Sequence, residues 1–341
     1  MGIAASATLL CAGLLAAPPD VEKPALERRA YAELHMGTAF RIVLFAPDKT
    51  TADAAAKAAF ARIKQLDGIM SDYNPHSELS RLSSSGPSEV GLPVGDDLWR
   101  VLSRAQSLAA ETDGAFDVTV GPLVQLWRRA RRNKKMPAAE RLAQARRSVG
   151  YRHVRLDPRR HAARLMRGGM RLDLGGIAKG DAADQALAVL ARRGVTRALV
   201  DASGDVAVGD PPPGKTGWRI GVAPLDKPQG PPSRTLVLAR SAVATSGDAF
   251  QYVELDGVRY SHILDPRTGL GLTTRSSVTV IAPDGLTADS LASAVSVLGP
   301  REGLKLIAKK QGTECLILRR VDGKIETHQS AGFEKLPADD K

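Results

Sequence analysis

Our prediction of the fold begins with residues 171–184, RLDLGGIAKGDAAD. Apolar and polar residues alternate over 170–174, which predicts a strand. The chain then passes through Gly175-Gly176 and enters a helix, whose body we expect from Asp184 until Gly194 ends it. The stretch therefore predicts a strand that turns sharply into a helix.

The turn between this strand and this helix is suited to an anion. Free backbone N–H groups and the positive end of the helix dipole face outward at a helix start. Lys179 adds a positive charge beside the turn, and Asp173 places a carboxylate just before it. Neither GxxxxGK[ST] nor GxGxxG is present, so the turn by itself fits either a phosphate site or simple packing.

Length and composition describe a globular chain with excess positive charge. The 341 residues are 43% hydrophobic and 25% charged, and the formal net charge is +11. This charge indicates good solubility, or attraction for an anionic ligand or membrane surface. No recognition motif accompanies it, so we expect no nucleic-acid partner. Residues 20–341 suffice for one large core, and we assign them to a single domain.

Residues 1–19 (MGIAASATLLCAGLLAAPP) have the pattern of a signal peptide. The apolar run from 3 to 17 is too short to span a membrane, although no basic residues precede it. We therefore expect export to the periplasm or cell envelope. Leu10 before Cys11 argues against a lipoprotein. Cys315 is then the one remaining cysteine, which we expect to be a buried apolar side chain, with no disulfide or zinc cluster.

Helices and strands are mixed without regular βα alternation, which predicts an α+β fold of mainly antiparallel sheets flanked by helices. We expect helices at 52–70 (with Thr51 as N-cap), 96–112, from Pro122 onward, 137–148, 287–298 and 301–310. We expect strands at 30–34, 40–47, 151–156, 197–201, 206–208, 218–223, 235–239, 251–255, 258–263 and 277–282, with a terminal hairpin around Asp322-Gly323. Residues 243–248 read as a loop, which could form a tight turn or a wall of a ligand site.

Residues 128–135 hold six basic residues in eight. A solvated insertion is the simplest interpretation of such a charge run. Contact with an acidic partner or an anionic membrane surface is the alternative.

Three further patterns could serve chemistry. Asp289 and Ser293, one helical turn apart, could hold a hard cation, or could complement the helix dipole and fill space. His262, at the end of a strand beside Asp265, could be a general base or be structural. Tyr73, in a polar loop, could anchor that loop or stack on a flat ligand.

Taken together, these motifs resemble those of the ApbE-type FAD:protein FMN transferases, in the family's order. The matching segments span Met36 to Gly299. They are HMGT from His35, SDYNPHSELSRL from Ser71, TDGAFDVTVGPL from Thr112, LDLGGIAKG from Leu172, SGD from Ser203, VATSGD from Val243, SHILDPRTG from Ser261 and TADSLASAVSVLG from Thr287.

This resemblance implies an enzyme with an ApbE-like (T-fold-like) architecture. It would bind FAD as substrate, cleave the pyrophosphate with Mg²⁺, and transfer FMN to a threonine hydroxyl of an exported or membrane redox protein. The product would be a phosphoester, and AMP would leave. The alternatives are a Mg²⁺-dependent FAD pyrophosphatase that gives FMN and AMP, and an exported FAD-binding protein without turnover.

The resemblance also assigns roles to residues of this chain. FAD would contact Met36, Tyr73, Ala115, Phe116, Asp117, Asp173, Lys179 and Ile263, with Tyr73 stacked on the isoalloxazine. The metal would be held by the backbone carbonyls of Gly176 and Ala292 and by the side chains of Asp289 and Ser293. His262 would be the base that activates the incoming hydroxyl, and Asp289 would be catalytic through the metal.

Three positions depart from the family pattern. Ser293 stands where threonine is more common, which keeps the hydroxyl. Ser203 replaces a glycine of the usual GGD, and Asp181 stands where an aromatic residue is common. We expect the last two to alter the adenosine side of the site without removing the chemistry.

Overall fold

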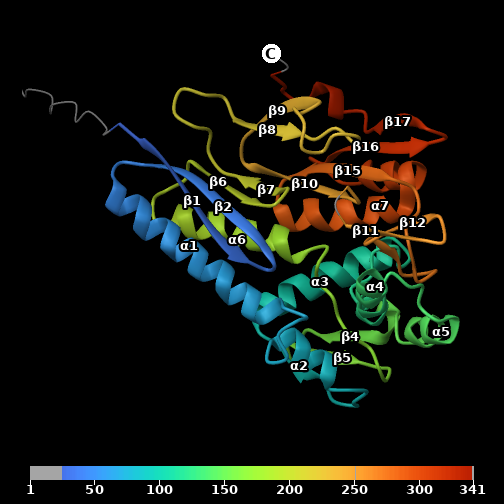
Figure 1. Cartoon of the computed structure of the whole chain (residues 1–341). Coiled ribbons are helices and arrows are strands. Elements are labelled where there is room, and N and C mark those ends of the chain that lie inside the picture. Colours follow the sequence, from blue (N-terminus) through green and yellow to red (C-terminus); the bar gives the residue numbers. More distant parts are fainter. Residues whose placement is uncertain (1–24, 250, 340–341) are drawn as a thin grey trace, which may run out of the picture.

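A computed structural model describes residues 25–249 and 251–339 of the chain (Figure 1). Its centre is an eight-stranded sheet in which every neighbouring pair is antiparallel. In sheet order the strands are β1 (Glu27–His35), β2 (Thr38–Ala46), β6 (Ala198–Ala202), β7 (Asp205–Val208), β10 (Ser241–Gly247), β15 (Ser276–Ala282), β16 (Glu314–Val321) and β17 (Lys324–Gln329). The expected α+β class with mainly antiparallel sheets is confirmed.

Three long helices cover one face of this sheet. They are α1 (Lys49–Met70), α6 (Ala178–Arg192) and α7 (Gly285–Ile307), and they pack side by side with α6 in the middle (Figure 1). Strand β2 shows why the helices lie there. Its alternate residues Phe40, Ile42 and Leu44 are fully buried in the core shared with the helices, as the two-residue period of a strand requires.

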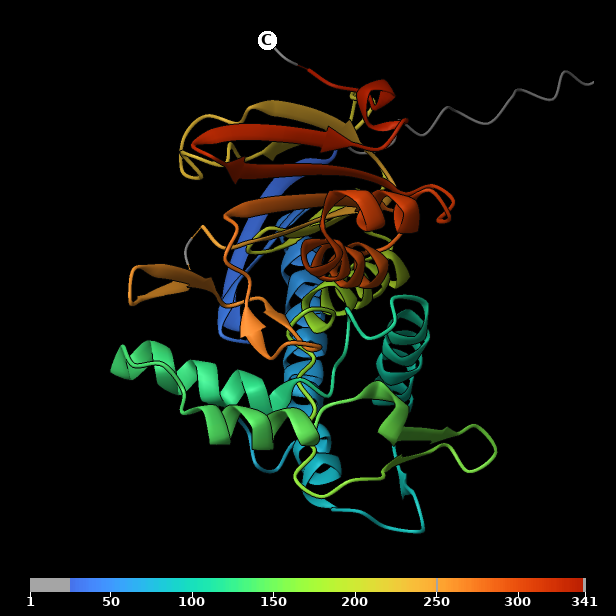
Figure 2. The same ribbon diagram turned by 90° about the vertical axis from the view of Figure 1, so that its right-hand side faces the viewer.

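The opposite face of the sheet is covered by a hairpin of β8 (Trp218–Val222) and β9 (Arg234–Leu238). Trp218 and Leu236 from this hairpin bury a second, smaller core together with Val43 and Phe45 of β2. The molecule is therefore layered as hairpin, sheet and helices, as seen in the upper half of Figure 2.

A second group of elements lies beyond one end of the three helices. It consists of α2 (Glu78–Ser84), α3 (Asp96–Glu111), the helical hairpin α4 (Gly121–Asn133) and α5 (Ala139–Arg147), the short helix η1 (Tyr151–His153), and a small sheet of β3 (Leu92–Pro93), β5 (Ala162–Leu165) and β4 (Val154–Asp157). The hairpin of α4 and α5 projects to one side in Figure 2. Two small hairpins, β11 (Tyr252–Leu255) with β12 (Val258–Ser261) and β13 (Leu264–Asp265) with β14 (Leu270–Gly271), approach α4 and share its apolar cluster. The chain ends with the short helix η2 (Phe333–Lys335).

The prediction of a strand at 170–174 is wrong. Met170, Leu172 and Leu174 are buried as their alternation indicated. Their backbone, however, finds other partners: the N–H of Leu172 donates to the Ser83 hydroxyl at 3.0 Å, and the N–H of Asp173 donates to the Val118 carbonyl at 2.8 Å. The segment is an extended connection, because no strand lies beside it to complete a ladder.

Helix α6 starts earlier than expected, at Ala178 instead of Asp184, so Lys179 lies in its first turn. Helix α1 begins at Lys49, and its N-cap is Asp48, whose side chain accepts from the N–H of Thr51; the prediction of Thr51 as N-cap is wrong. The two helices expected at 287–298 and 301–310 lie end to end within α7, and the non-helical Gly299 separates them as the sequence predicted. There φ is 73°, a left-handed backbone that favours glycine.

Two other segments also differ from expectation. Residues 243–248 are mostly strand, because β10 pairs with both β7 and β15 in the middle of the sheet. Residues 128–135 are no insertion: they form the end of α4 and the turn after it, and Arg128 and Arg131 are only partly exposed. The strand expected at 151–156 begins as η1 and continues as β4.

The leader assigned to residues 1–19, including Cys11, lies outside the described residues. Within the described ranges, no helix is both long and apolar enough to cross a membrane. Cys315 is buried, as expected, and among the described residues it is a free cysteine; burial raises the pKa of its thiol to about 12.

Candidate active site

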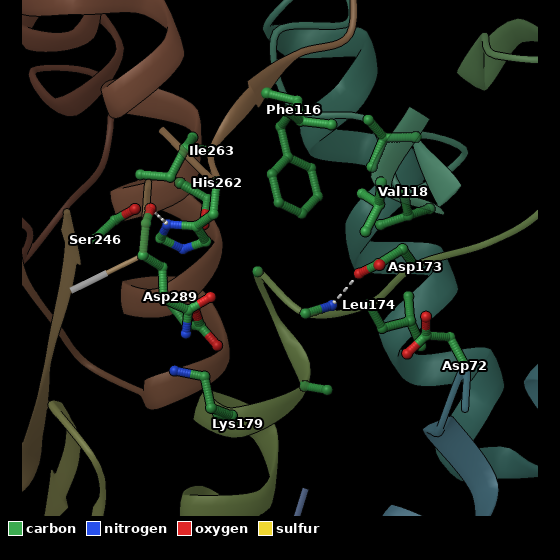
Figure 3. Close-up of a pocket in the computed structure, with 18 of the residues that line it drawn as sticks. Asp72, Phe116, Val118, Asp173, Leu174, Lys179, Ser246, His262, Ile263 and Asp289 are labelled. Atoms are coloured by element: carbon green, nitrogen blue, oxygen red, sulfur yellow. Dashed lines mark hydrogen bonds between the residues drawn. The ribbon is translucent and has the colours of Figure 1, made fainter. Parts of the chain in front are cut away.

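One cavity of about 780 Å³ lies between the two groups of elements. In Figure 3, His262, Asp289 and Lys179 lie on one side of it, Asp173 and Asp72 on the other, and Phe116 at the top. The cavity brings together every residue that the sequence assigned to the site except Ala292. Those lining it are Met36, Tyr73, Ala115, Phe116, Asp117, Asp173, Gly176, Lys179, His262, Ile263, Asp289 and Ser293.

The first turns of α6 and α7 cap each other at one edge of this cavity. The N–H of Gly180, in the first turn of α6, donates to Asp289 Oδ2 on α7 at 3.1 Å. In return, Asp184 on α6 accepts from the N–H groups of Gly285 and Leu286 at 2.7 and 2.9 Å. Carboxylates are favoured at such ends because they satisfy free N–H groups and oppose the helix dipole.

Glycine at position 180 is what lets the two helices approach so closely. A Cβ at Gly180 would lie 2.0 Å from the Gly285 carbonyl oxygen and 2.8 Å from the Asp289 Cβ. Any side chain there would push α7 away and move Asp289. The KG of the central sequence motif therefore has a packing role that sets the position of a site carboxylate.

Charges at this edge are buried and interdependent. Burial raises the pKa of Asp289 to about 7, and the nearby Asp205 adds to this effect. Lys179 forms an ion pair with Asp205. Burial alone would lower the pKa of Lys179, but its attraction to Asp205 and Asp289 outweighs burial and raises it. The sequence did not lead us to predict Asp205 as a site residue. Its position in the SGD motif was the signal that could have identified it.

The oxygen atoms near Asp289 fit a magnesium ion. Ser293, one turn further along α7, also lines the cavity, and a Cβ on Gly176 would lie 2.7 Å from its Oγ. Gly176 thus leaves its backbone close to this hydroxyl. Within the described ranges, no group of three His, Cys, Asp or Glu side chains could hold a metal. A single carboxylate with neutral oxygens suits Mg²⁺, which keeps several of its own waters.

Ala292 is not brought to the cavity. It is buried, and its carbonyl accepts the Ser296 hydroxyl at 2.8 Å within α7. Its assignment as a metal ligand remains a prediction that the lining of the cavity does not support.

His262 is held in one tautomer. Its Nδ1 lies 3.0 Å from the Gln251 carbonyl oxygen, which can only accept, so Nδ1 carries the proton and Nε2 is left as an acceptor. Burial lowers the pKa of His262 to about 4, and the charges of Arg131 and Lys179 add to the effect. Asp265, which follows His262 in the sequence, forms an ion pair with Arg267 at 2.9 Å. Gln251, which the sequence analysis missed, orients the ring.

Tyr73 is 75% exposed and is held by a basic side chain. The guanidinium of Arg128 lies 4.2 Å from the centre of its ring. The same guanidinium pairs with Asp72 and, at 3.1 Å, with Asp173. Arg128 therefore ties the Tyr73 loop to Asp173 on the same side of the cavity, and the interpretation of residues 128–135 as a wholly solvated run is wrong for this residue.

The two remaining acids of the predicted set hold loops in place. Burial raises the pKa of Asp173, whose Oδ1 accepts from the N–H of Gly175 at 2.8 Å. Burial also raises the pKa of Asp117, whose carboxylate accepts from the N–H groups of Thr119 and Tyr151 at 2.8 and 2.7 Å. Both acids line the cavity, but their hydrogen bonds first of all shape its walls.

The two departures expected to affect the adenosine side do not line the cavity. Asp181 is buried beneath α3 and forms a two-pronged ion pair with Arg100, both contacts at 2.9 Å. Ser203 lies in a turn with φ 57° and bonds to Thr38. The expectation for Asp181 is therefore corrected: its carboxylate ties α6 to α3.

Comparisons with known proteins agree with this arrangement. The sequence model described as the ApbE family matches residues 36–317. The FAD:protein FMN transferase of Haemophilus influenzae is 32% identical over 310 residues, covering 88% of this chain and 89% of the relative. That of Vibrio cholerae is 31% identical over 336 residues and covers 97% of each.

Solved structures show the same likeness. The ApbE protein of Thermotoga maritima has a TM-score of 0.81 and 32% identity, covering 92% of this chain and all of that one. The flavin transferase ApbE of Vibrio cholerae has a TM-score of 0.81 and 28% identity, covering 91% and 99%. All of the first neighbour and 99% of the second are thus represented in the present architecture.

Proposed function

This chain belongs to the ApbE family of flavin-transferring enzymes, and on that premise we propose that it transfers FMN from FAD to a threonine hydroxyl of an acceptor protein, requires Mg²⁺ and releases AMP. The observation that carries the proposal is the convergence of Lys179, Asp289, Ser293 and His262 on one cavity. A cation, a hard-metal ligand pair and a neutral base are what attack by a hydroxyl on a diphosphate requires.

The metal requirement rests on the donor set described above. Asp289 and Ser293 would hold the ion through side-chain oxygens, with the Gly176 carbonyl beside them. When bound, Mg²⁺ would neutralise charge on the diphosphate and polarise the phosphorus that is attacked.

The chain's own residues supply binding and proton transfer. The N–H groups of Ala178 and Gly180 in the first turn of α6 already donate to the Leu174 carbonyl and to Asp289, so Lys179 would supply the positive charge that binds the diphosphate oxygens. Nε2 of His262 would accept the proton of the threonine hydroxyl as its oxygen bonds to the FMN phosphorus. The bond from that phosphorus to the bridging oxygen breaks, and AMP leaves with that oxygen. A neutral imidazole is suited to this step, and a pKa near 4 keeps His262 neutral above about pH 5.

The flavin ring would be bound at the other end of the cavity by Tyr73. Replacing the ring in Tyr73→Ala should weaken FAD binding by about 1–3 kcal/mol, the range for loss of a base-stacking aromatic side chain. Tyr73→Phe keeps the stacking face and should bind FAD nearly as the wild type does. Isothermal titration with FAD measures both, and an unchanged affinity in Tyr73→Ala would refute the stacking role.

Water at the same phosphorus would give FMN and AMP, so an FAD pyrophosphatase is the second candidate. The exposure of Tyr73 favours it, because solvent reaches the cavity. A non-catalytic FAD-binding protein is the third. One experiment separates them: incubate the protein with FAD, Mg²⁺ and a threonine-containing acceptor domain, then measure AMP and the flavin fluorescence of the denatured acceptor.

Labelled acceptor with AMP supports the transferase. AMP without labelled acceptor identifies the pyrophosphatase, and the absence of both products identifies the binding protein.

The acceptor we propose is an exported or membrane redox protein, in the periplasm or cell envelope, because residues 1–19 have a leader pattern. Fractionation of cells that express the full chain tests this location. Recovery of this protein in the cytoplasm alone would contradict it.

A further inference from the structure

The positive charge of this protein is confined to one part of the chain. Residues 128–167, here called the basic segment, contain 15 Lys and Arg but only 2 Asp and Glu. The whole chain has 48 Lys and Arg and 37 Asp and Glu, so 33 basic and 35 acidic residues remain outside this segment. The net charge of +11 therefore comes entirely from the basic segment, and the rest of the molecule is close to neutral.

Much of this charge is exposed and unpaired. Arg129, Arg132, Lys135, Arg141 and Arg147 are exposed, and none of these five has an ion pair with another described residue. Like charges at this density repel one another and cost stability in the isolated protein. Their side chains are open to opposite charges from a partner.

The basic segment also frames a second cavity, of about 610 Å³. Arg146, Arg147, Arg152 and His153 line it, and Arg267 approaches from the loop that follows His262. Arg146 reaches across to this loop, where its guanidinium donates to the Arg267 carbonyl at 2.7 Å. Two acids also line the cavity, Asp113 and Asp117, and Asp113 pairs with Arg152 at 2.8 Å. The basic residues outnumber them, and the cavity is built partly on the active-site loop.

The two cavities are neighbours. Asp117 and Pro266 line both of them. Helix α4 connects the surfaces further, because Val124, Arg128 and Arg131 line the first cavity while Arg129 and Arg132 face solvent. A macromolecule that presents a hydroxyl to His262 must cover the mouth of the first cavity, and its flank then lies against the basic segment.

We propose that the basic segment is the docking surface for the acceptor protein, which it recognises through an acidic face next to the target hydroxyl. This rests on the proposed function. Complementary charge of this kind accelerates encounter and fixes orientation. A membrane surface would also attract the charge, but the concave second cavity beside the reactive loop fits protruding carboxylate side chains better than a flat bilayer.

The test uses two fluorescent peptides, each with one threonine, flanked by glutamates in one and by glutamines in the other. The four substitutions Arg129→Gln, Arg132→Gln, Lys135→Gln and Arg141→Gln are combined in one full-length variant. Glutamine has a similar helix propensity, so α4 and α5 should remain folded. The matched control removes four exposed charges elsewhere, with Lys57→Gln and Lys64→Gln on α1 and Arg192→Gln and Arg193→Gln at the end of α6.

We expect the wild type to bind the glutamate peptide at least about tenfold more tightly than the glutamine peptide at low salt. The preference should disappear between about 0.05 and 0.5 M NaCl as the charges are screened. The quadruple variant should lose the preference and the control should keep it. Equal binding of both peptides, or equal loss in the control, would overturn the proposal.

Vesicles of anionic phospholipid provide the second arm. If vesicle binding depends on the four basic residues and peptide binding does not, the surface is a membrane contact and the proposal fails. AMP release from FAD is measured on the same samples. Absence of AMP with an intact peptide preference would refute the proposed function and leave the docking surface standing; AMP without any preference would refute the docking surface alone.

Discussion

Asp184 and Asp289 perform the same structural task on two neighbouring helices, yet only one of them lies in the candidate active site. Each accepts backbone N–H groups from the first turn of the other's helix. Burial raises the pKa of each to about 7. The start of α7 has a further cap, because the Asp284 side chain accepts from the N–H of Thr287, whereas no side chain at the N-cap position of α6 does so.

The difference lies in what faces each carboxylate. Both oxygens of Asp184 are used by the N–H groups of α7, and the residue does not line the cavity. Asp289 uses Oδ2 for Gly180 and lies beside Lys179, Ser293 and open space. The same residue type, on two helices that it helps to cap, is structural where all its hydrogen bonds are internal, and available for chemistry where one side faces a cavity.

The largest effect should come from Asp289→Ala. It removes the only charged ligand proposed for the metal, so turnover should fall by about 10²–10³-fold, the range for loss of one electrostatic stabilising group. Asp184→Ala should keep near wild-type turnover per folded molecule. AMP release from FAD with saturating Mg²⁺ measures both. Full activity in Asp289→Ala would remove the distinction between the two carboxylates.

For stability the order of the two carboxylates is reversed, and the change at Asp184 should have the larger effect. Asp184→Ala leaves two N–H groups of α7 without their acceptor and should lower the free energy of unfolding by about 1–2 kcal/mol, as for loss of an N-cap. Asp289→Asn keeps one acceptor oxygen for Gly180 and should be destabilised less. Urea unfolding at pH 7 gives both values. Equal midpoints for Asp184→Ala and the wild type would show that these hydrogen bonds contribute nothing.

A further effect is expected in the pH dependence of stability. Because burial raises the pKa of Asp184 from 3.8 to about 7, the folded state binds its proton more tightly than the unfolded state does. The stability that this provides is present below about pH 4 and is lost as pH rises through about 7. Asp184→Asn cannot titrate, so its stability relative to the wild type should improve across that range. A pH-independent difference in urea midpoint would contradict the raised pKa.

The smallest effect is a shift in one titration. Burial, together with the charges of Arg131 on α4 and Lys179 on α6, lowers the pKa of His262 to about 4 in the free protein. A bound diphosphate would offset the charges of Lys179 and Arg131, so FAD should raise the pKa of His262. NMR titration of the imidazole with and without FAD measures it, with His328 on β17 as a distant control. If His262 does not respond, the diphosphate does not lie near it.

The sequence by itself determined the fold class, most helices and the content of the site. The side chains that its short motifs predicted as site residues nearly all line one cavity. This is because each motif combines a local turn with the residue types that the chemistry needs. The amphipathic period fixed α1 and α3, and Asp256-Gly257 fixed the β11–β12 hairpin, because these signals are local.

Only the tertiary structure decided which neighbours each residue meets. The alternation at 170–174 buried its apolar side chains as expected, but no adjacent strand was there to pair with it. Arg128, in a run that reads as solvated, reaches Tyr73 and Asp173, and the carbonyl of Gln251 orients His262 from a separate segment of the chain. Asp184 and Asp289 cannot be told apart by local sequence, since their hydrogen bonds join helices about a hundred residues apart. Such contacts depend on the packing of the whole chain, which no local pattern records.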